Sequence, residues 1–142
     1  MTAHTSDFDH VYYFRVALHP EKINKMVPAI IAGIGMEKLE EIEAVAFMGN
    51  SGALLAPLVA LYLGKTLIMV RKTTRGVHSS KLVEGDKGAR KYIIVDDVVA
   101  TGTTARKIMK RIKKWSGAEC LGVLEMNDVE DDDFRELTQV DL

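Results

Sequence analysis

The chain has 142 residues, a net charge of −1 and one cysteine. This length suggests a single domain that buries about 70% of its unfolded surface, so it needs neither a disulfide nor a structural metal. The near-neutral charge provides no global attraction to nucleic acid or membranes, and Cys120, in an apolar run, fits a reducing cytoplasm. The N-terminus lacks signal-peptide features, and the longest apolar run, Ala53 to Leu63, is too short to cross a bilayer.

The first part of the chain, residues 1–43, carries no motif with a recognisable chemistry. Apolar residues alternate with other residues from Val11 to Leu18, which predicts a strand with one buried face. A helix is expected to open at Pro20, because proline is favoured in a first helical turn. Its apolar stripe contains Ile23, Met26, Val27, Ile30 and Ile31. The charged residues 36–42 fit either a short helix or a loop.

A strand, a glycine-rich loop and a helix are expected next. The apolar run Ala44–Met48 predicts a buried strand, and Ala53–Leu63 predicts a helix closed by Gly64. Between them lie Gly49, Asn50, Ser51 and Gly52. Such a loop either holds an anion at the N-terminus of the helix or is an ordinary tight turn, and these four residues alone favour the turn.

A further strand, Thr66–Val70, is followed directly by Arg71 and Lys72. Strands that alternate with helices predict a parallel sheet with right-handed crossovers. Two cations at the carboxyl end of a strand are either a solvated cap or a clamp for a polyanion.

The segment from Thr73 to Arg90 has no apolar periodicity and contains three glycines and several cations. Loops of this length in a compact domain are usually functional or disordered. The segment is therefore interpreted either as a mobile lid that brings cations to a reaction or as a flexible solvated hairpin. His78 lies within it and either contacts phosphate, protonates a leaving group or is simply exposed.

Residues 92–104 combine a strand, an acidic pair and a loop of small residues. The run Tyr92–Val95 predicts a strand buried on both faces, and Asp96 and Asp97 follow at its carboxyl end, where open α/β sheets bind ligands. The small and hydroxylated residues before the next helix predict a phosphate site: Ala100, Thr101, Gly102, Thr103 and Thr104. Carboxylates beside a phosphate site suit sugar hydroxyls or a divalent cation.

The last elements are a basic helix, a strand and an acidic tail. Residues Ala105–Trp115 predict a helix whose cations either bind RNA or a membrane surface or form a solvated face. Glu119–Met126 predicts the last buried strand. The acidic segment Asn127–Glu136 is either part of a hood over the site or a solvated tail.

The thirteen residues 92–104 resemble the phosphoribosyl-pyrophosphate (PRPP) signature of type I phosphoribosyltransferases. They contain apolar residues, two acids, two apolar residues, a small residue and then Thr-Gly-Thr-Thr. The resemblance extends from about Val45 to Met126. It implies an α/β fold with a Rossmann-like parallel twisted sheet flanked by helices. The single domain would comprise a small N-terminal hood at 1–43, a core at 44–127 and an acidic segment at 128–142.

The same resemblance implies a role for each candidate site residue. Asp96 and Asp97 would hold the ribose hydroxyls, directly or through metal-bound water, while the loop at 100–104 would hold the 5-phosphate. The loop at 49–52, with a strained peptide bond expected at Asn50–Ser51, would hold the pyrophosphate together with Arg71 and Lys72. The segment 73–90 would be the catalytic lid, with His78 among the catalytic residues.

The implied activity is Mg²⁺-dependent transfer of phosphoribose from PRPP to a nucleobase, with release of pyrophosphate, in a cytoplasmic homodimer that serves nucleotide salvage. Many 6-oxopurine members carry an acid where Ala100 stands, so the chain resembles adenine-, orotate- or phage-type members more closely. The alternative is a PRPP-sensing regulator that binds nucleic acid through Arg106–Lys114. Nucleic acid is not the expected partner, because acidic segments balance this helix and few aromatic residues are available to stack on bases.

Overall fold

The computed structural model describes residues 20–73, 81–96, 102–125 and 134–135. The expected strand at Val11–Leu18 lies outside these residues. The elements along the chain are α2 (Pro20–Ile34), α3 (Met36–Glu41), β1 (Ala44–Met48), α4 (Gly49–Leu63), β2 (Thr66–Val70), β3 (Val83–Gly85), β4 (Lys91–Asp96), α5 (Thr103–Ser116), β5 (Glu119–Glu125) and β6 (Phe134–Arg135). The residues expected to form either a short helix or a loop are helical, as α3.

The strands form one sheet in the order β3-β2-β1-β4-β5-β6. The four inner strands are parallel, while β3 and β6 pair antiparallel at the two edges. The predicted α/β fold with a parallel sheet is therefore confirmed. The two edge strands were not predicted as strands, because segments of two or three residues are too short to show an alternating pattern.

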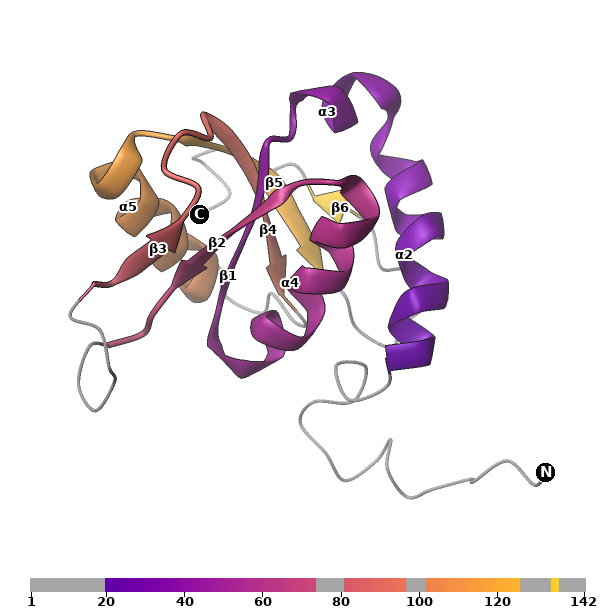
Figure 1. Cartoon of the computed structure of the whole chain (residues 1–142), viewed down its shortest axis with the longest axis horizontal. Helices are drawn as coiled ribbons and strands as arrows, with labels where there is room; N and C mark the ends of the chain where they lie inside the picture. The colour runs from indigo at the N-terminus through magenta and orange to yellow at the C-terminus, as the bar shows by residue number, and fades with distance from the viewer. Residues whose placement is uncertain (1–19, 74–80, 97–101, 126–133, 136–142) are drawn as a thin grey trace.

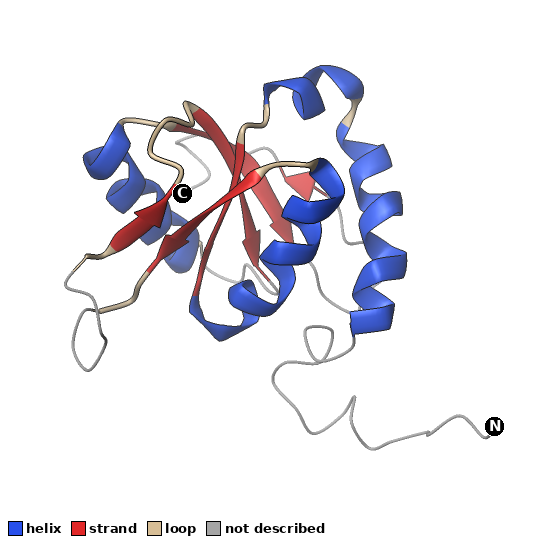
Figure 2. Cartoon of the chain, viewed as in Figure 1, coloured by secondary structure: helices blue, strands red, loops and turns tan. Residues whose placement is uncertain are grey.

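Helices cover both faces of this sheet, with α4 and α2 on one side and α5 on the other (Figure 1, Figure 2). The chain moves outward from β1 to β2 in one direction and from β4 to β5 in the opposite direction. Right-handed crossovers that run in opposite directions place their helices on opposite faces. The two helices that leave the centre of the sheet therefore start at the same edge but pack on different faces.

The inner strands are apolar because both of their faces are buried. The strand β1 is buried at all five positions, and β4 at every position after Lys91. Alternate residues of each strand enter two different clusters: Val45 and Ile93 pack with α4 and α2, whereas Ala46 and Ile94 pack with α5. This arrangement confirms the prediction that residues 92–95 form a strand buried on both faces.

The helix α2 packs against the core. Its residues Ile23, Val27 and Ile31 are buried in the same cluster as Leu55 and Val59 of α4. The part of the predicted hood that the structure describes is therefore continuous with the core, and a hood function for residues 1–43 stays a prediction. Within the described ranges, no helix combines the length and the apolar character that crossing a bilayer requires.

Candidate active site

The carboxyl ends of β1 and β4 lie side by side at the point where the strand order reverses. From here β1 leads through α4 to β2, and β4 leads toward α5 and β5 on the other side. Open α/β sheets bind ligands in the crevice at such a point. Gly49, which begins α4, and Asp96, which ends β4, are both located here. The topology thus brings together two groups of residues that the sequence separates by more than forty positions.

A hydrogen bond connects these two groups. The Ser51 hydroxyl donates to Oδ1 of Asp96 across 3.4 Å. Within the described part of the chain, Ser51 and Asp96 are the polar residues classed as buried, each 8% exposed. Burying a carboxylate is costly unless polar groups stabilise it, so this carboxylate at a ligand-binding edge indicates a functional site rather than a packing role.

The first turn of α4 differs from the sequence prediction. Gly49, Asn50, Ser51 and Gly52 were expected to form a loop before the helix, but they are its first turn. The reason is the close approach of the chain at Gly52. A Cβ there would lie 2.9 Å from the Cβ of Phe47, so glycine allows this turn to pack closely against the end of β1. The strained peptide bond expected at Asn50–Ser51 is not a cis bond, since no cis peptide occurs among the described residues.

The N-terminus of α4 can still hold an anion. The residue before it, Met48, is extended and provides no side-chain cap, and the first turn contains no acidic residue. The free N–H groups of a first turn and the helix dipole attract negative charge. The backbone at Gly49–Gly52 therefore retains the chemistry predicted for it, as a helix start rather than as a loop.

Lys72 reaches this helix start from the end of β2. A Cβ built on Gly49 would lie 3.3 Å from Cε and 3.5 Å from Nζ of Lys72, so the ammonium group lies directly beside the first residue of α4. Gly49 also has a φ of 82°, which favours glycine over other residues. A lysine charge beside a helix N-terminus makes a stronger anion site than either feature alone.

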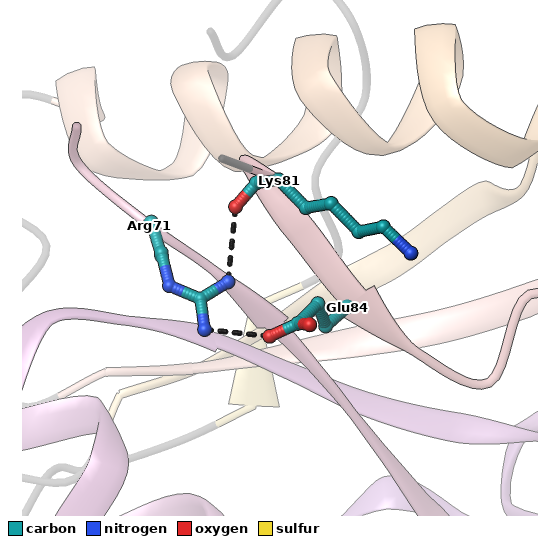
Figure 3. A network of polar contacts seen from close by, with 3 residues as sticks. All are labelled: Arg71, Lys81 and Glu84. Atoms are coloured by element: carbon teal, nitrogen blue, oxygen red, sulfur yellow. Dashed lines mark hydrogen bonds and ion pairs between the residues drawn. The ribbon is translucent and has the colours of Figure 1, made fainter. Parts of the chain in front are cut away.

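Arg71 makes different contacts from those predicted. Its Nη2 forms an ion pair with Oε2 of Glu84 at 2.5 Å, and its Nη1 donates to the carbonyl oxygen of Lys81 at 2.9 Å (Figure 3). The side chain is only 18% exposed. These contacts fasten the base of the β2–β3 hairpin. A direct contact between Arg71 and pyrophosphate is thus not supported by the contacts that the structure describes, and it stays a prediction.

The helix α5 starts at Thr103, two residues earlier than expected. Its N-cap, Gly102, has a φ of 75°, and the first turn holds no acidic residue and no side-chain cap. Thr103 and Thr104 are therefore first-turn residues whose hydroxyls and N–H groups suit a phosphate. Asp97, Ala100 and Thr101 complete the predicted signature but lie outside the described residues, as does His78.

The expected lid from Thr73 to Arg90 is shorter in the structure. Residues 83–85 form β3 and pair with β2. The following turn is fastened to the core: Thr66 donates to Asp86 at 2.6 Å, and the backbone N–H of Arg90 donates to Glu43 at 3.1 Å. The predicted lid was therefore too long at its C-terminal end. Residues 74–80, which remain the candidates for a lid, lie outside the described residues.

Sequence reasoning overlooked one acid at this edge of the sheet. Glu125 ends β5 and is the register partner of Asp96 on the neighbouring parallel strand. Its Oε2 atom is buried. The signal that identified Asp96, an acid directly after an apolar strand, was also present here, but the strand was expected to extend to Met126. Glu125 is thus an additional candidate for the site.

A separate basic groove lies between β3 and α5. It encloses about 810 Å³ and is lined by residues that include Lys81, Lys87, Arg111, Lys114 and Trp115. The ammonium of Lys87 lies 5.8 Å from the centre of the Trp115 ring. The predicted basic helix therefore combines with the edge strand to form one cationic surface.

No family model matches the chain. It is 34% identical over 90 residues to an orotate phosphoribosyltransferase of Methanothermobacter thermautotrophicus, a match that covers 62% of this chain and 49% of the relative. The chain spans about half the length of the curated relatives that it matches.

Solved structures show the same fold. Orotate phosphoribosyltransferase from Aeropyrum pernix aligns with a TM-score of 0.62 and 22% identity, over 80% of this chain and 63% of that one. Adenine phosphoribosyltransferase from Saccharomyces cerevisiae, in complex with an imino-altritol bisphosphate and adenine, aligns with a TM-score of 0.60 and 25% identity, over 82% and 73% of the two chains.

Proposed function

We propose that the chain is a member of the type I phosphoribosyltransferase family, and that it transfers phosphoribose from PRPP to a nucleobase and releases pyrophosphate. One observation carries the proposal. At the switch point of the sheet, the buried carboxylate of Asp96 lies beside the start of α4, and Lys72 lies beside the same helix start, while α5 begins with a second N-terminus that has no side-chain cap; these groups match the chemistry of the three parts of PRPP. The ligand has a 5-phosphate at one end, a diol in the middle and a pyrophosphate at the other end.

Each part of the ligand has a matching part of the chain. The first turn of α5, with Thr103 and Thr104, suits the 5-phosphate. The carboxylate of Asp96 accepts hydrogen bonds from ribose hydroxyls. The first turn of α4 and the ammonium of Lys72 suit the pyrophosphate. In this reaction the bond from C1 of the ribose to the pyrophosphate breaks as the bond to the base nitrogen forms. The chain then accelerates transfer by holding both reactants and stabilising the charge of the departing pyrophosphate.

The acidic residues at the site fit a magnesium ion. Hard divalent cations prefer oxygen ligands, and Mg²⁺ usually takes only one or two protein carboxylates together with phosphate oxygens of the substrate. Asp96 and Glu125, register partners on neighbouring strands, supply such carboxylates. Asp97, which lies outside the described residues, is proposed as a third. The described residues hold no group of three or more potential ligands. When bound, Mg²⁺ would offset the negative charge of the pyrophosphate.

The acceptor base is proposed to be orotate or adenine. Relatives and structural neighbours of the chain carry these two specificities in their names. Ala100, which stands where many 6-oxopurine members have an acid, favours these bases over guanine and hypoxanthine. We further propose a single cytoplasmic domain that forms a homodimer, in which residues 1–43 contribute to the hood over the base. Analytical ultracentrifugation tests the dimer.

A panel of nucleobases tests the proposed function. Each base is added with PRPP and Mg²⁺, and pyrophosphate release is measured. We expect release with one base and none with PRPP alone. The double variant Asp96→Asn with Asp97→Asn should keep its fold, as judged by circular dichroism, and lose turnover. Full activity in that variant would refute the assignment.

A PRPP-sensing regulator is the second candidate, and the basic groove favours it. Lys87 and Lys114, together with Trp115, offer cations and an aromatic ring to a single strand of nucleic acid. RNA mobility shifts in the presence and absence of PRPP distinguish the two functions. A PRPP-dependent shift combined with no pyrophosphate release across the panel would favour the regulator, whereas base-dependent release without a shift would favour the enzyme.

A further inference from the structure

We infer that Arg111 is a positioning residue that sets Lys72 against the start of α4, an inference that rests on the proposed function of this site. Among the described residues, Lys72 is the lysine whose side chain lies beside Gly49. A lysine side chain is flexible, so a reliable anion site requires that its backbone be held. The residue directly before Lys72 is Arg71, and its carbonyl oxygen accepts a hydrogen bond from Nη1 of Arg111.

The same atom of Arg111 also contacts the other side of the site. It lies 4.0 Å from Sδ of Met48, the N-cap residue directly before Gly49. One guanidinium group therefore touches the two residues that precede Lys72 and Gly49. Met48 ends β1 and Arg71 directly follows β2, and these two strands are parallel neighbours. The relative placement of the lysine and the helix start consequently depends on a side chain that lies on the opposite face of the sheet.

The helix α5 is thereby connected to both ends of the proposed ligand site, to one of them through Met48 and Arg71. Its first residue, Thr103, belongs to the proposed 5-phosphate site, and Arg111 lies eight residues further along, about 12 Å away at 1.5 Å per residue. Arginine suits this role because its rigid fork of donors holds a carbonyl in a defined direction, and its charge adds to the positive potential near the pyrophosphate.

The hairpin contacts explain why a single hydrogen bond at Arg71 is effective. The Arg71 side chain is fixed by Glu84 and by the carbonyl of Lys81, so its conformation is restrained from the β3 side (Figure 3). The carbonyl of the same residue is fixed from the α5 side by Arg111. Restraint from both sides leaves the chain little freedom at the point where Lys72 begins.

Three variants test the inference: Arg111→Gln, Arg111→Lys and the control Lys114→Gln. Lys114 lines the same groove on the same helix, so its replacement removes one positive charge without removing a contact to Arg71. Calorimetry of each protein measures the binding of two probes, magnesium pyrophosphate and ribose 5-phosphate. Arg111→Gln should weaken pyrophosphate binding about tenfold, the effect expected on losing a charged hydrogen bond that orders the site. Its ribose 5-phosphate affinity should change less than twofold.

The control and the conservative variant define the outcome. Lys114→Gln should leave both affinities within about twofold, and Arg111→Lys, which keeps the charge and one donor, should recover part of the pyrophosphate affinity. Equal losses in Arg111→Gln and Lys114→Gln would show a charge effect only and would overturn the inference. Equal losses for the two probes in Arg111→Gln would show general damage and would also overturn it. A wild-type protein that binds neither probe would instead refute the proposed function.

Discussion

The helices α4 and α5 begin at the same edge of the sheet, yet they are built very differently. Between Gly49 and Leu63, α4 contains no charged residue, and its first turn is glycine-rich. By contrast, α5 carries six cations and no acid between Thr103 and Ser116, and its first turn contains two threonines. Neither N-terminus has a side-chain cap, so both can bind an anion. Only α5 adds cationic side chains along its own length.

The difference shows that α4 depends on its neighbours. The anion site proposed for α4 uses backbone N–H groups and Lys72, which follows β2, and the inferred restraint on that lysine comes from Arg111 of α5 through Arg71. The site proposed for α5 uses residues of its own first turn. A change elsewhere in the fold should therefore damage the α4 site more readily than the α5 site, and the predictions below test this contrast.

The largest expected effect comes from replacing the side chains that are proposed to bind the anion at each helix start. Lys72→Met should weaken the binding of magnesium pyrophosphate by about 10- to 100-fold, because a charged contact contributes about 1.5–3 kcal/mol, and should leave ribose 5-phosphate binding unchanged. The pair Thr103→Val with Thr104→Val should show the opposite pattern. Calorimetry with both probes measures the two effects. If each variant weakened both probes equally, the two helix starts would not be separate subsites.

The glycines of α4 provide a second test. Gly52→Ala places a Cβ 2.9 Å from Phe47, so the first turn must shift, at a cost of about 1–3 kcal/mol in the free energy of unfolding. Gly64→Ala, at the other end of the helix, has no atom within 4 Å of its Cβ and costs about 1 kcal/mol for its φ of 67°.

Urea unfolding measures both costs, and calorimetry measures pyrophosphate binding. Only Gly52→Ala should weaken the binding, since only this glycine positions the N–H groups. If Gly52→Ala and Gly64→Ala bound pyrophosphate equally well, the packing of the first turn of α4 would not matter for pyrophosphate binding.

Alkaline pH should lower the stability of the folded chain through two groups on the face of the sheet that α5 covers. Burial raises the pKa of the Cys120 thiol from an ordinary 9.0 to about 12 and raises the pKa of Tyr92 above its ordinary value. Both groups belong to the α5 face of the core. Because the folded chain holds these protons more tightly than the unfolded chain, this stability is complete below about pH 9 and is lost as the pH rises toward 12.

Urea unfolding at pH 8 and pH 10 should show a loss on the order of 1 kcal/mol from these two groups. The variant Tyr92→Phe should lose less stability between the two pH values, because one of the titrating groups is absent. An identical pH dependence in this variant would mean that Tyr92 does not titrate during unfolding.

The central strands and the helices α4 and α5 were predictable from the sequence, because their apolar patterns extend over several residues. Continuous apolar runs identified β1 and β4, and the periodicity of Ile108 and Ile112 identified α5. The short strand β3 escaped prediction because three residues show no period. The helical first turn at Gly49–Gly52 was not predicted, because glycine is a local signal for loops. Here Gly52 instead permits close packing on Phe47, a contact that becomes visible only in the folded chain.

The candidate site was predictable as a set of residue types but not as a set of contacts. Asp96 and the start of α4 were both expected near a ligand, and the structure brings them together. The different roles of Arg71 and Lys72 were not predictable, because adjacent residues at a strand end leave in different directions. Which of them faces the hairpin depends on Glu84, a residue of the strand that the sequence pattern did not show.

The smallest expected effect tests whether the bond between the α4 start and β4 matters for the site. Ser51→Ala removes the 3.4 Å hydrogen bond to Asp96, which is long and hence weak. We expect a loss of less than about 1 kcal/mol in unfolding free energy and a change of at most about threefold in the KM for PRPP. Ser51→Thr, which keeps the hydroxyl, serves as the control. A loss of turnover comparable to that of Asp96→Asn would mean that Ser51 itself contacts the substrate, and α4 would then resemble α5 in using a side-chain hydroxyl of its first turn.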